Sequence, residues 1–162
     1  MGQYDIRLVP MTADMLHRYF REYENDADLC LEGQPYLPFA YSKEWVDRYI
    51  QRLAAMHRIS LAILCGDDIA GEVVLRDIEE HRCATMGICL KNARYKDRGI
   101  GTQAERLAIQ YVFRELDIPT LFADAVRTNA RSRHVLEKAG FVPFREDMNY
   151  TYYRLDRDGK AR

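Results

Sequence analysis

The sequence has 162 residues, of which 48% are hydrophobic and 30% charged, and its formal net charge is -1. This length suits a single domain over residues 1–162, and the balanced charge argues against a nucleic-acid partner. No basic-then-apolar leader opens the chain and no apolar run approaches the ~18 residues of a membrane span, so we expect no membrane association. The four cysteines lack metal-ligand spacing, so we expect free thiols, no metal and a cytoplasmic location.

Two kinds of hydrophobic pattern alternate along the chain. Alternation of apolar and polar residues indicates strands, and apolar residues three and four positions apart indicate helices. In chain order, the patterns predict a strand at 4–9, a helix at 15–23, a helix at 45–53 with Ser42 as its N-cap, strands at 59–65, 69–75 and 84–90, a helix at 99–112, a strand at 120–126, a helix at 131–138 closed by Gly140, and strands at 141–144 and 150–155.

The connections between these elements indicate how they are arranged. Gly66-Asp67-Asp68 forms a plausible hairpin turn, so the three strands from 59 to 90 are expected to form an antiparallel meander. Residues 24–41 contain glycine and prolines and break every period, which predicts a long irregular loop. A core at 6–155 is followed by a polar tail, 156–162, which we expect to fray. Mixed strands and helices favour an α/β or α+β sheet with helices on both faces.

The stretch Lys91-Asn92-Ala93-Arg94-Tyr95-Lys96-Asp97-Arg98-Gly99-Ile100-Gly101-Thr102-Gln103-Ala104 follows a predicted strand and opens a predicted helix. Free backbone N–H groups at a helix start, together with the helix macrodipole, favour a phosphate. Gly99 and Gly101 leave room for its approach, and Lys96 and Arg98 add positive charge. The simpler alternative is a basic loop that caps a helix.

The same glycines also fit a dinucleotide-binding fingerprint, G-x-G-x-x-A, over residues 99–104. In that fold the first glycine directly follows the strand, whereas residues 91–98 intervene here. Asp117 and Asp124 nevertheless lie near the distance expected for a ribose-binding acid, so a dinucleotide-binding enzyme stays open as an alternative.

Two motifs in the right order resemble the GNAT superfamily of N-acetyltransferases. Residues 96–101 resemble its acetyl-CoA pyrophosphate loop, [QR]-x-x-G-x-[GA], with Lys96 in the place of Gln or Arg. Residues 129–141 resemble its N-x-x-[AS]-x-x-x-[YL]-x-K-x-G-F segment. The similarity is closest to the branch of ribosomal-protein N-terminal acetyltransferases and spermidine acetyltransferases. It implies a mixed, mostly antiparallel central sheet with helices on both faces.

The resemblance also implies a reaction, the direct attack of a primary amine on acetyl-CoA. The acceptor would be a small-molecule amine or a peptide N-terminus, and a homodimer is possible. Leu136 stands where many family members have a Tyr acid, so a CoA-binding regulatory module without turnover is an alternative. The residues that the resemblance assigns to the cofactor are Ile88, Cys89, Leu90, Lys96, Asp97, Arg98, Gly99, Ile100, Gly101, Thr102, Asn129 and Ser132.

Candidates for the catalytic and acceptor groups follow with less support. Glu72, on a strand expected beside the cofactor, could act as base, although it could equally face solvent; Tyr150 or Tyr152 could replace the missing acid. Asn129 and Ser132 have helix capping as their simpler interpretation. In the irregular loop, four acids would attract a cationic amine and three aromatic residues would form a wall: Glu24, Asp26, Asp28 and Glu32, with Tyr36, Phe39 and Tyr41.

Overall fold

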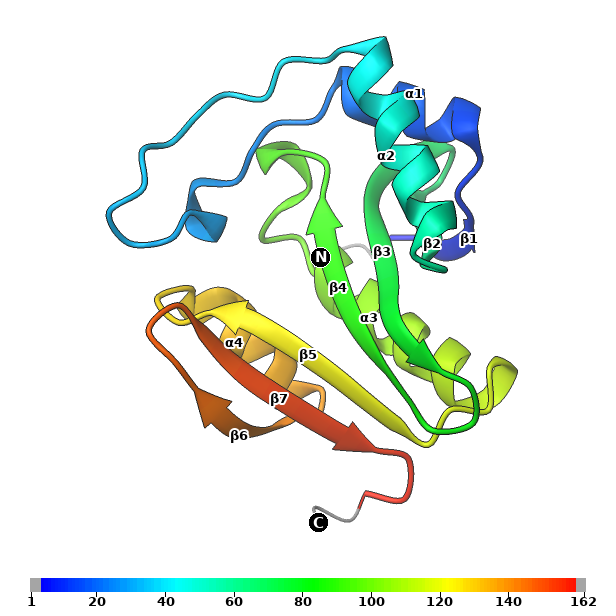
Figure 1. The fold of residues 1–162 in the computed structure, drawn as a ribbon, viewed down its shortest axis with the longest axis vertical. Coiled ribbons are helices and arrows are strands. Elements are labelled where there is room, and N and C mark those ends of the chain that lie inside the picture. The colour runs from blue at the N-terminus through cyan, green and yellow to red at the C-terminus, as the bar shows by residue number, and fades with distance from the viewer. Residues whose placement is uncertain (1–3, 160–162) are drawn as a thin grey trace.

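The computed structural model describes residues 4–159, which form one seven-stranded sheet in the order β1-β2-β3-β4-β5-β7-β6 (Figure 1). The predicted order of strands and helices is confirmed. The strands are β1 (Ile6–Pro10), β2 (Ile59–Cys65), β3 (Asp68–Glu79), β4 (Cys83–Leu90), β5 (Thr120–Val126), β6 (Val142–Glu146) and β7 (Tyr150–Asp156). The α-helices are α1 (Ala13–Arg21), α2 (Lys43–Ala55), α3 (Ile100–Gln110) and α4 (Ala130–Lys138).

All neighbouring strands are antiparallel except β4 and β5, which are parallel. The predicted meander of β2, β3 and β4 is therefore confirmed, with Gly66 at a φ of 61° in its first turn. The mostly antiparallel sheet agrees with the family resemblance.

The parallel pair is short and then opens. β4 and β5 are in register only from Cys83 opposite Thr120 to Met86 opposite Ala123. β5 keeps β7 as its partner along its whole length, whereas the end of β4 stays with β3. The two strands consequently diverge in a V, which Figure 1 shows at the centre of the molecule.

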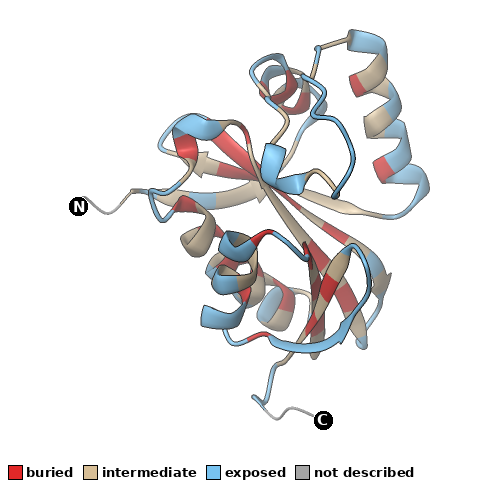
Figure 2. Ribbon diagram, turned by 90° about the vertical axis from the view of Figure 1, so that its left-hand side faces the viewer, coloured by how far each residue is buried: buried red, intermediate tan, exposed pale blue. Residues whose placement is uncertain are grey.

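Helices pack on both faces of this sheet, as predicted. α3 and α4 cover one face, where Val73, Leu75 and Leu121 are completely buried. α1 and α2 cover the other face at the β2–β3 end, around Leu16 and Val46. Buried residues lie along the middle strands and on the helix sides that face them (Figure 2).

Side chains define where three of the helices begin. Thr12, Ser42 and Asn129 accept a backbone N–H at the starts of α1, α2 and α4, which confirms Ser42 as an N-cap. Gly140, with a φ of 104°, follows the end of α4 as predicted. A π-helical turn, Tyr111–Glu115, extends α3.

The predicted boundary of the frayed tail, residue 156, is wrong because this residue still belongs to a strand. Asp156 is the last residue of β7, and its Oδ1 accepts a hydrogen bond from Thr120 Oγ1 at 2.7 Å. Residues 160–162 of that tail lie outside the described residues. Within residues 4–159, no helix is long and apolar enough to cross a bilayer, and no group of three or more potential ligands could hold a metal ion.

Gly71 permits the close approach of β3 and β4 beside the open end of the V. A Cβ there would lie 2.5 Å from the backbone oxygen of Cys89 and 3.0 Å from Ile63 Cδ1. Gly71→Ala should therefore lower the free energy of unfolding by roughly 1–3 kcal/mol, as for other overpacked interiors, in a urea titration.

Gly87→Ala is the matched control, because its added Cβ meets only Arg76 Nη1, at 3.8 Å. Equal stability changes in the two variants would show that the close approach of β4 to β3 is not what makes an alanine unfavourable at position 71.

Candidate active site

The start of α3 offers unshielded backbone N–H groups. β4 ends at Leu90, a 3-10 turn follows at Ala93–Tyr95, and Gly99 begins α3 with a φ of 76°. Among the four α-helices of residues 4–159, α3 alone has no side chain that accepts a hydrogen bond at its N-cap. These amides and the helix dipole make the helix start suitable for an anion.

This helix start opens onto a cavity beside the end of β4 and the start of α4, which we call the α3 cavity. An added Cβ at Gly99 would meet nothing within 4 Å, and one at Gly101 would come no closer than 4.0 Å to Leu90 Cδ1. The predicted cofactor residues that line the cavity are Ile88, Cys89, Leu90, Lys96, Asp97, Gly99, Gly101, Thr102, Asn129 and Ser132.

Two predicted cofactor residues have side chains engaged elsewhere. Ile100 is 1% exposed and packs in the core, and Arg98 Nη1 donates to Tyr4 Oη at 3.5 Å. Any contact of Ile100 with an anion would therefore come from its backbone, whereas the Arg98 side chain is exposed. Asn129 Oδ1 accepts from the Ser132 N–H at 3.1 Å, so both residues serve the α4 cap and also line the cavity.

Ion pairs surround the mouth of the α3 cavity. Lys96 Nζ lies 2.7 Å from Asp26 Oδ2, and both side chains are 20% exposed. Arg131 pairs with Asp97 at 3.3 Å and with Asp28 at 3.9 Å. Asp26 and Asp28 therefore neutralise cations beside the anion site, which corrects the expectation that they attract a cationic acceptor.

A second cavity, the strand cavity, lies between β4, β5 and α4. Tyr150 lines it together with Leu136 and Ser132. Tyr152, the other candidate acid, lines neither cavity; its hydroxyl donates to Asp147 Oδ2 at 2.7 Å, a bond that raises the pKa of Tyr152. Tyr150 is thus the better placed of the two.

Glu105 was not predicted as a site residue, although it lines both cavities. It is only 5% exposed, and its Oε1 has no hydrogen-bond partner. Burial raises the pKa of Glu105 to about 7. The signal in the sequence is an acid at helical spacing from Gly101 and Ala108, on the face that must be buried.

Glu72 lies on the other face of the sheet, the face covered by α1 and α2. In the β3–β4 register it is the cross-strand partner of Cys89. Tyr49 Oη donates to its Oε1 at 2.7 Å, and Ser60 Oγ donates to its Oε2 at 2.5 Å. With 5% exposure, Glu72 does not face solvent, so that alternative is wrong. Burial raises the pKa of Glu72, and the two hydrogen bonds oppose this rise.

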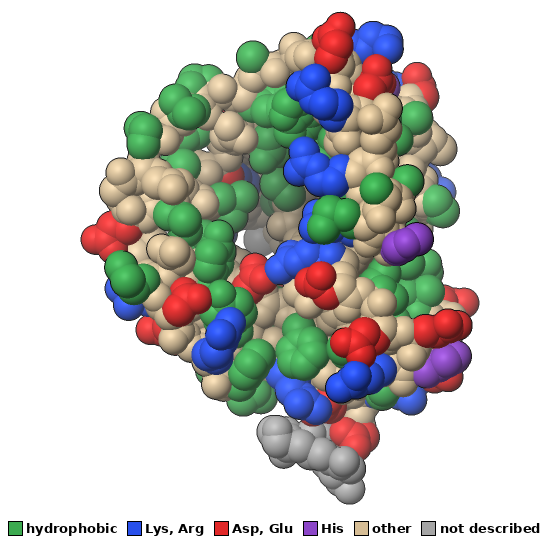
Figure 3. Space-filling model, viewed as in Figure 1, with side chains coloured by type: hydrophobic (Ala, Val, Ile, Leu, Met, Phe, Trp, Pro, Cys, Tyr) green, Lys and Arg blue, Asp and Glu red, His purple; other side chains and the backbone are tan. Residues whose placement is uncertain are grey.

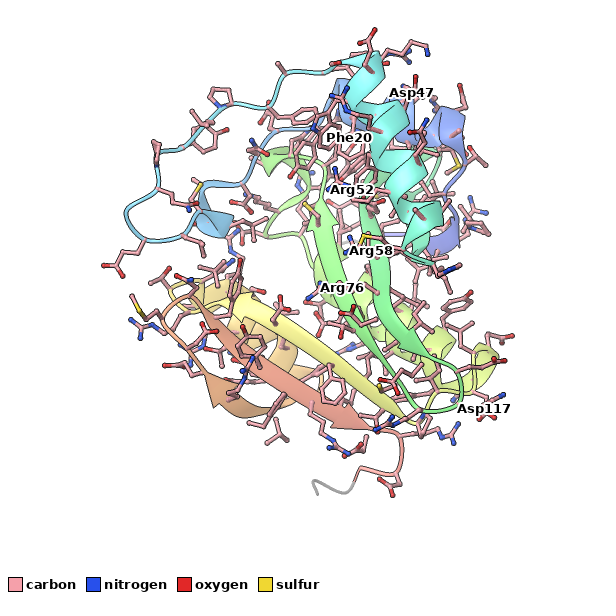
Figure 4. All side chains as sticks on the ribbon, in the orientation of Figure 1. Phe20, Asp47, Arg52, Arg58, Arg76 and Asp117 are labelled. Carbon is pink, nitrogen blue, oxygen red and sulfur yellow. The ribbon has the colours of Figure 1, made fainter. Side chains whose placement is uncertain are left out.

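Glu72 lines an open pocket walled by aromatic rings, which we call the aromatic pocket. Phe20, labelled in Figure 4, lies where α1, α2 and the end of β4 come together, and Figure 3 shows the hollow that separates this region from β5 and β7. Of the three predicted wall residues only Phe39 lines the pocket; the hydroxyls of Tyr36 and Tyr41 are bonded to the Asn25 carbonyl and His17. The other aromatic lining residues are Tyr19, Phe20, Tyr23, Trp45 and Tyr49.

The family comparison agrees with this geometry. The model of the acetyltransferase (GNAT) domain matches residues 5–142, most of the chain. The chain belongs to the GNAT acetyltransferase family. This GNAT acetyltransferase accordingly transfers the acetyl group of acetyl-CoA to an amine. The dinucleotide alternative is wrong, and the aspartates considered for it pair with arginines instead, Asp117 with Arg157 and Asp124 with Arg76.

Relatives and solved structures are consistent with the assignment. Spermidine N(1)-acetyltransferase of Escherichia coli K12 is 26% identical over 141 residues, covering 85% of this GNAT chain and 73% of its own. The Vibrio cholerae spermidine N-acetyltransferase in complex with CoA and spermine superimposes with a TM-score of 0.77 at 17% identity, over 95% and 96% of the two chains. Campylobacter jejuni N-acetyltransferase PseH in complex with acetyl coenzyme A gives 0.63 at 20% identity, over 70% and 79%.

Proposed function

We propose that the α3 cavity holds acetyl-CoA, with its pyrophosphate on the first-turn amides of α3 and its arm along Ile88–Leu90. The observation that carries this proposal is the uncapped start of α3 at the open end of the V. Lys96 and Arg131 lie beside it, each paired with an aspartate, and Asn129 and Ser132 lie along the path of the arm. The cosubstrate brings an acetyl group activated as a thioester.

A charge at the second position of α3 tests this assignment. Gly101→Asp should weaken acetyl-CoA binding at least about tenfold in a calorimetric titration, because unit charges near ~4 Å repel by roughly 1–4 kcal/mol at a protein surface. The fold should persist, since the added Cβ has room and an acid suits the first turn of a helix.

Gly101→Asn, which has the same size without the charge, is the control and should bind much more tightly than Gly101→Asp. Equal affinities for the two variants would contradict a pyrophosphate at this helix start.

We further propose that the acceptor is a primary alkylamine of the polyamine kind that enters the aromatic pocket. Rings that surround a cationic nitrogen stabilise it, and they also pack on methylene groups. Glu72 lies in the same pocket, opposite Cys89 on the strand assigned to the cofactor arm. The Escherichia coli relative is a spermidine N(1)-acetyltransferase, which supports the same class. A peptide N-terminus is the competing acceptor.

In the proposed reaction, Glu72 accepts the proton that the attacking amine loses. The amine nitrogen forms its bond to the acetyl carbon, the carbon–sulfur bond breaks, and the sulfur leaves with the electron pair. Leu136 has no proton to donate to that sulfur. Tyr150 lines the strand cavity together with Leu136, and its hydroxyl can donate one. Tyr150 is therefore assigned as the acid, in preference to Tyr152.

Glu72→Gln tests the base. The variant should lower kcat about 100-fold, the lower range for general bases, and leave acetyl-CoA affinity unchanged. Because the ionised carboxylate is the base and burial raises its pKa, wild-type kcat/KM should fall as pH decreases through a midpoint above the usual carboxyl range, and the variant should lose this limb.

Glu80→Gln, at an exposed acid beyond the end of β3, is the control and should retain the wild-type pH profile. A Glu72→Gln enzyme with an unaltered profile would show that Glu72 only supports Tyr49 and Ser60.

Release of CoA thiol across an amine panel tests the acceptor. Spermidine and spermine should give a kcat/KM at least about tenfold above that of a peptide N-terminus. Phe39→Leu should reduce the kcat/KM for spermidine and spermine by roughly 2- to 30-fold, the usual range for a lost cation–π contact. Phe144→Leu, at an exposed ring on β6, should have no effect. Acetyl-CoA binding without thiol release from any amine would favour the regulatory module, and preference for the peptide would overturn the polyamine assignment.

Three broader assignments complete the proposal. A single domain over residues 1–162 is supported by the continuous sheet from β1 to β7. A cytoplasmic location is supported by the free state of all four cysteines, and a homodimer by the family resemblance.

A further inference from the structure

Glu105 occupies a position where an acid has no evident structural use. It lies one helical turn beyond Gly101 on α3, beside the completely buried Ala104 and Ala108. The residue lines the α3 cavity and the strand cavity, so its side chain stands where the two cavities meet. On the proposed function, this is the path from the pyrophosphate to the acetyl group.

The carboxyl of Glu105 has unused hydrogen-bonding capacity. Its Oε1 is buried without a partner, a state that destabilises a fold unless a ligand satisfies the atom. Burial is the whole cause of the rise of its pKa to about 7. The titratable or charged residues that line the same two cavities, from the irregular loop, the Lys96 loop, α4, β4, β5 and β7, are Asp26, Asp28, Lys96, Asp97, Arg131, Cys89, Asp124 and Tyr150.

We propose that Glu105 binds the pantetheine arm of acetyl-CoA as a protonated carboxyl that donates a hydrogen bond to a carbonyl of the arm. This inference rests on the proposed function. The arm carries amide carbonyls, and it would bring an anionic pyrophosphate close to Glu105, which disfavours an ionised carboxylate there. The neutral acid satisfies both its own buried oxygen and the arm.

Binding should consequently be linked to proton uptake. At pH 8 a carboxyl with a pKa of about 7 is mostly ionised in the free protein. Formation of the complex should then take up about 0.9 proton, and at pH 6 only about 0.1, by the linkage of protonation and binding.

Calorimetric titration of acetyl-CoA in two buffers of different ionisation enthalpy measures this uptake directly. Wild type and the control Glu115→Gln, at an exposed acid in the π-helical turn after α3, should show it at pH 8. Glu105→Gln should take up about 0.9 proton fewer and should bind about tenfold more tightly than wild type at pH 8, with equal affinity at pH 6, because its amide donates the hydrogen bond without protonation.

Glu105→Leu separates the hydrogen bond from the charge. It should weaken binding about tenfold at pH 6, where wild type is mostly protonated, because the arm then lacks its partner. The pKa of Glu105 is raised from its usual 4.5 to about 7 in the free folded protein. The stability that Glu105 contributes is therefore fully present below pH 4.5 and is lost as the pH rises through about 7. Glu105→Leu should therefore melt at least about 4 °C above wild type at pH 8.

The outcomes distinguish the two levels of the assignment. Proton uptake that is the same in wild type and Glu105→Gln, or unimpaired binding by Glu105→Leu at pH 6, overturns the role of Glu105 while acetyl-CoA binding itself stands. Failure of wild type to bind acetyl-CoA at any pH overturns the proposed cofactor site, and this inference with it.

Discussion

The separation of β4 from β5 is the constraint on which the rest of the site depends. β5 pairs with β7 along one edge over its whole length, whereas its other edge has no β4 partner beyond Ala123 and lines the strand cavity there. The end of β4 is held away from β5 by Lys91, which hydrogen-bonds to Ala70 and Glu24 through its backbone and pairs with Glu22 through its side chain. An ion pair between Arg76 and Asp124 crosses the face of the sheet at the point where the strands part.

Opening the sheet at this point creates two different environments around one strand. On the side of α3 and α4, the unshielded backbone amides at the start of α3 favour an anion, and Lys96 and Arg131 beside them are paired with aspartates. On the side of α1 and α2, aromatic rings and a buried carboxylate favour a cationic amine. Ile88 and Cys89 line both the α3 cavity and the aromatic pocket, so in the proposed function one strand positions both substrates.

Much of this arrangement could be predicted because its signals are local. Ser42 and Asn129 precede helical patterns and cap those helices, and Gly99 and Gly101 keep a helix start open. Glu105 was missed because an acid among the alanines of α3 is conspicuous only once its face of that helix is known to be buried. The pairing of Asp26 with Lys96 was also hidden, since it joins residues 70 positions apart through an irregular loop.

The sequence by itself determined the order of strands and helices, the open glycine-containing start of α3 and the family, because hydrophobic period, caps and glycine positions act over a few residues. Only the tertiary structure decided which acid is buried and which is paired. Glu72 is buried by α1, α2 and the sheet, and Glu105 by the strands beneath α3. Desolvation is set by the atoms that surround a carboxyl, and those atoms come from elements far apart along the chain.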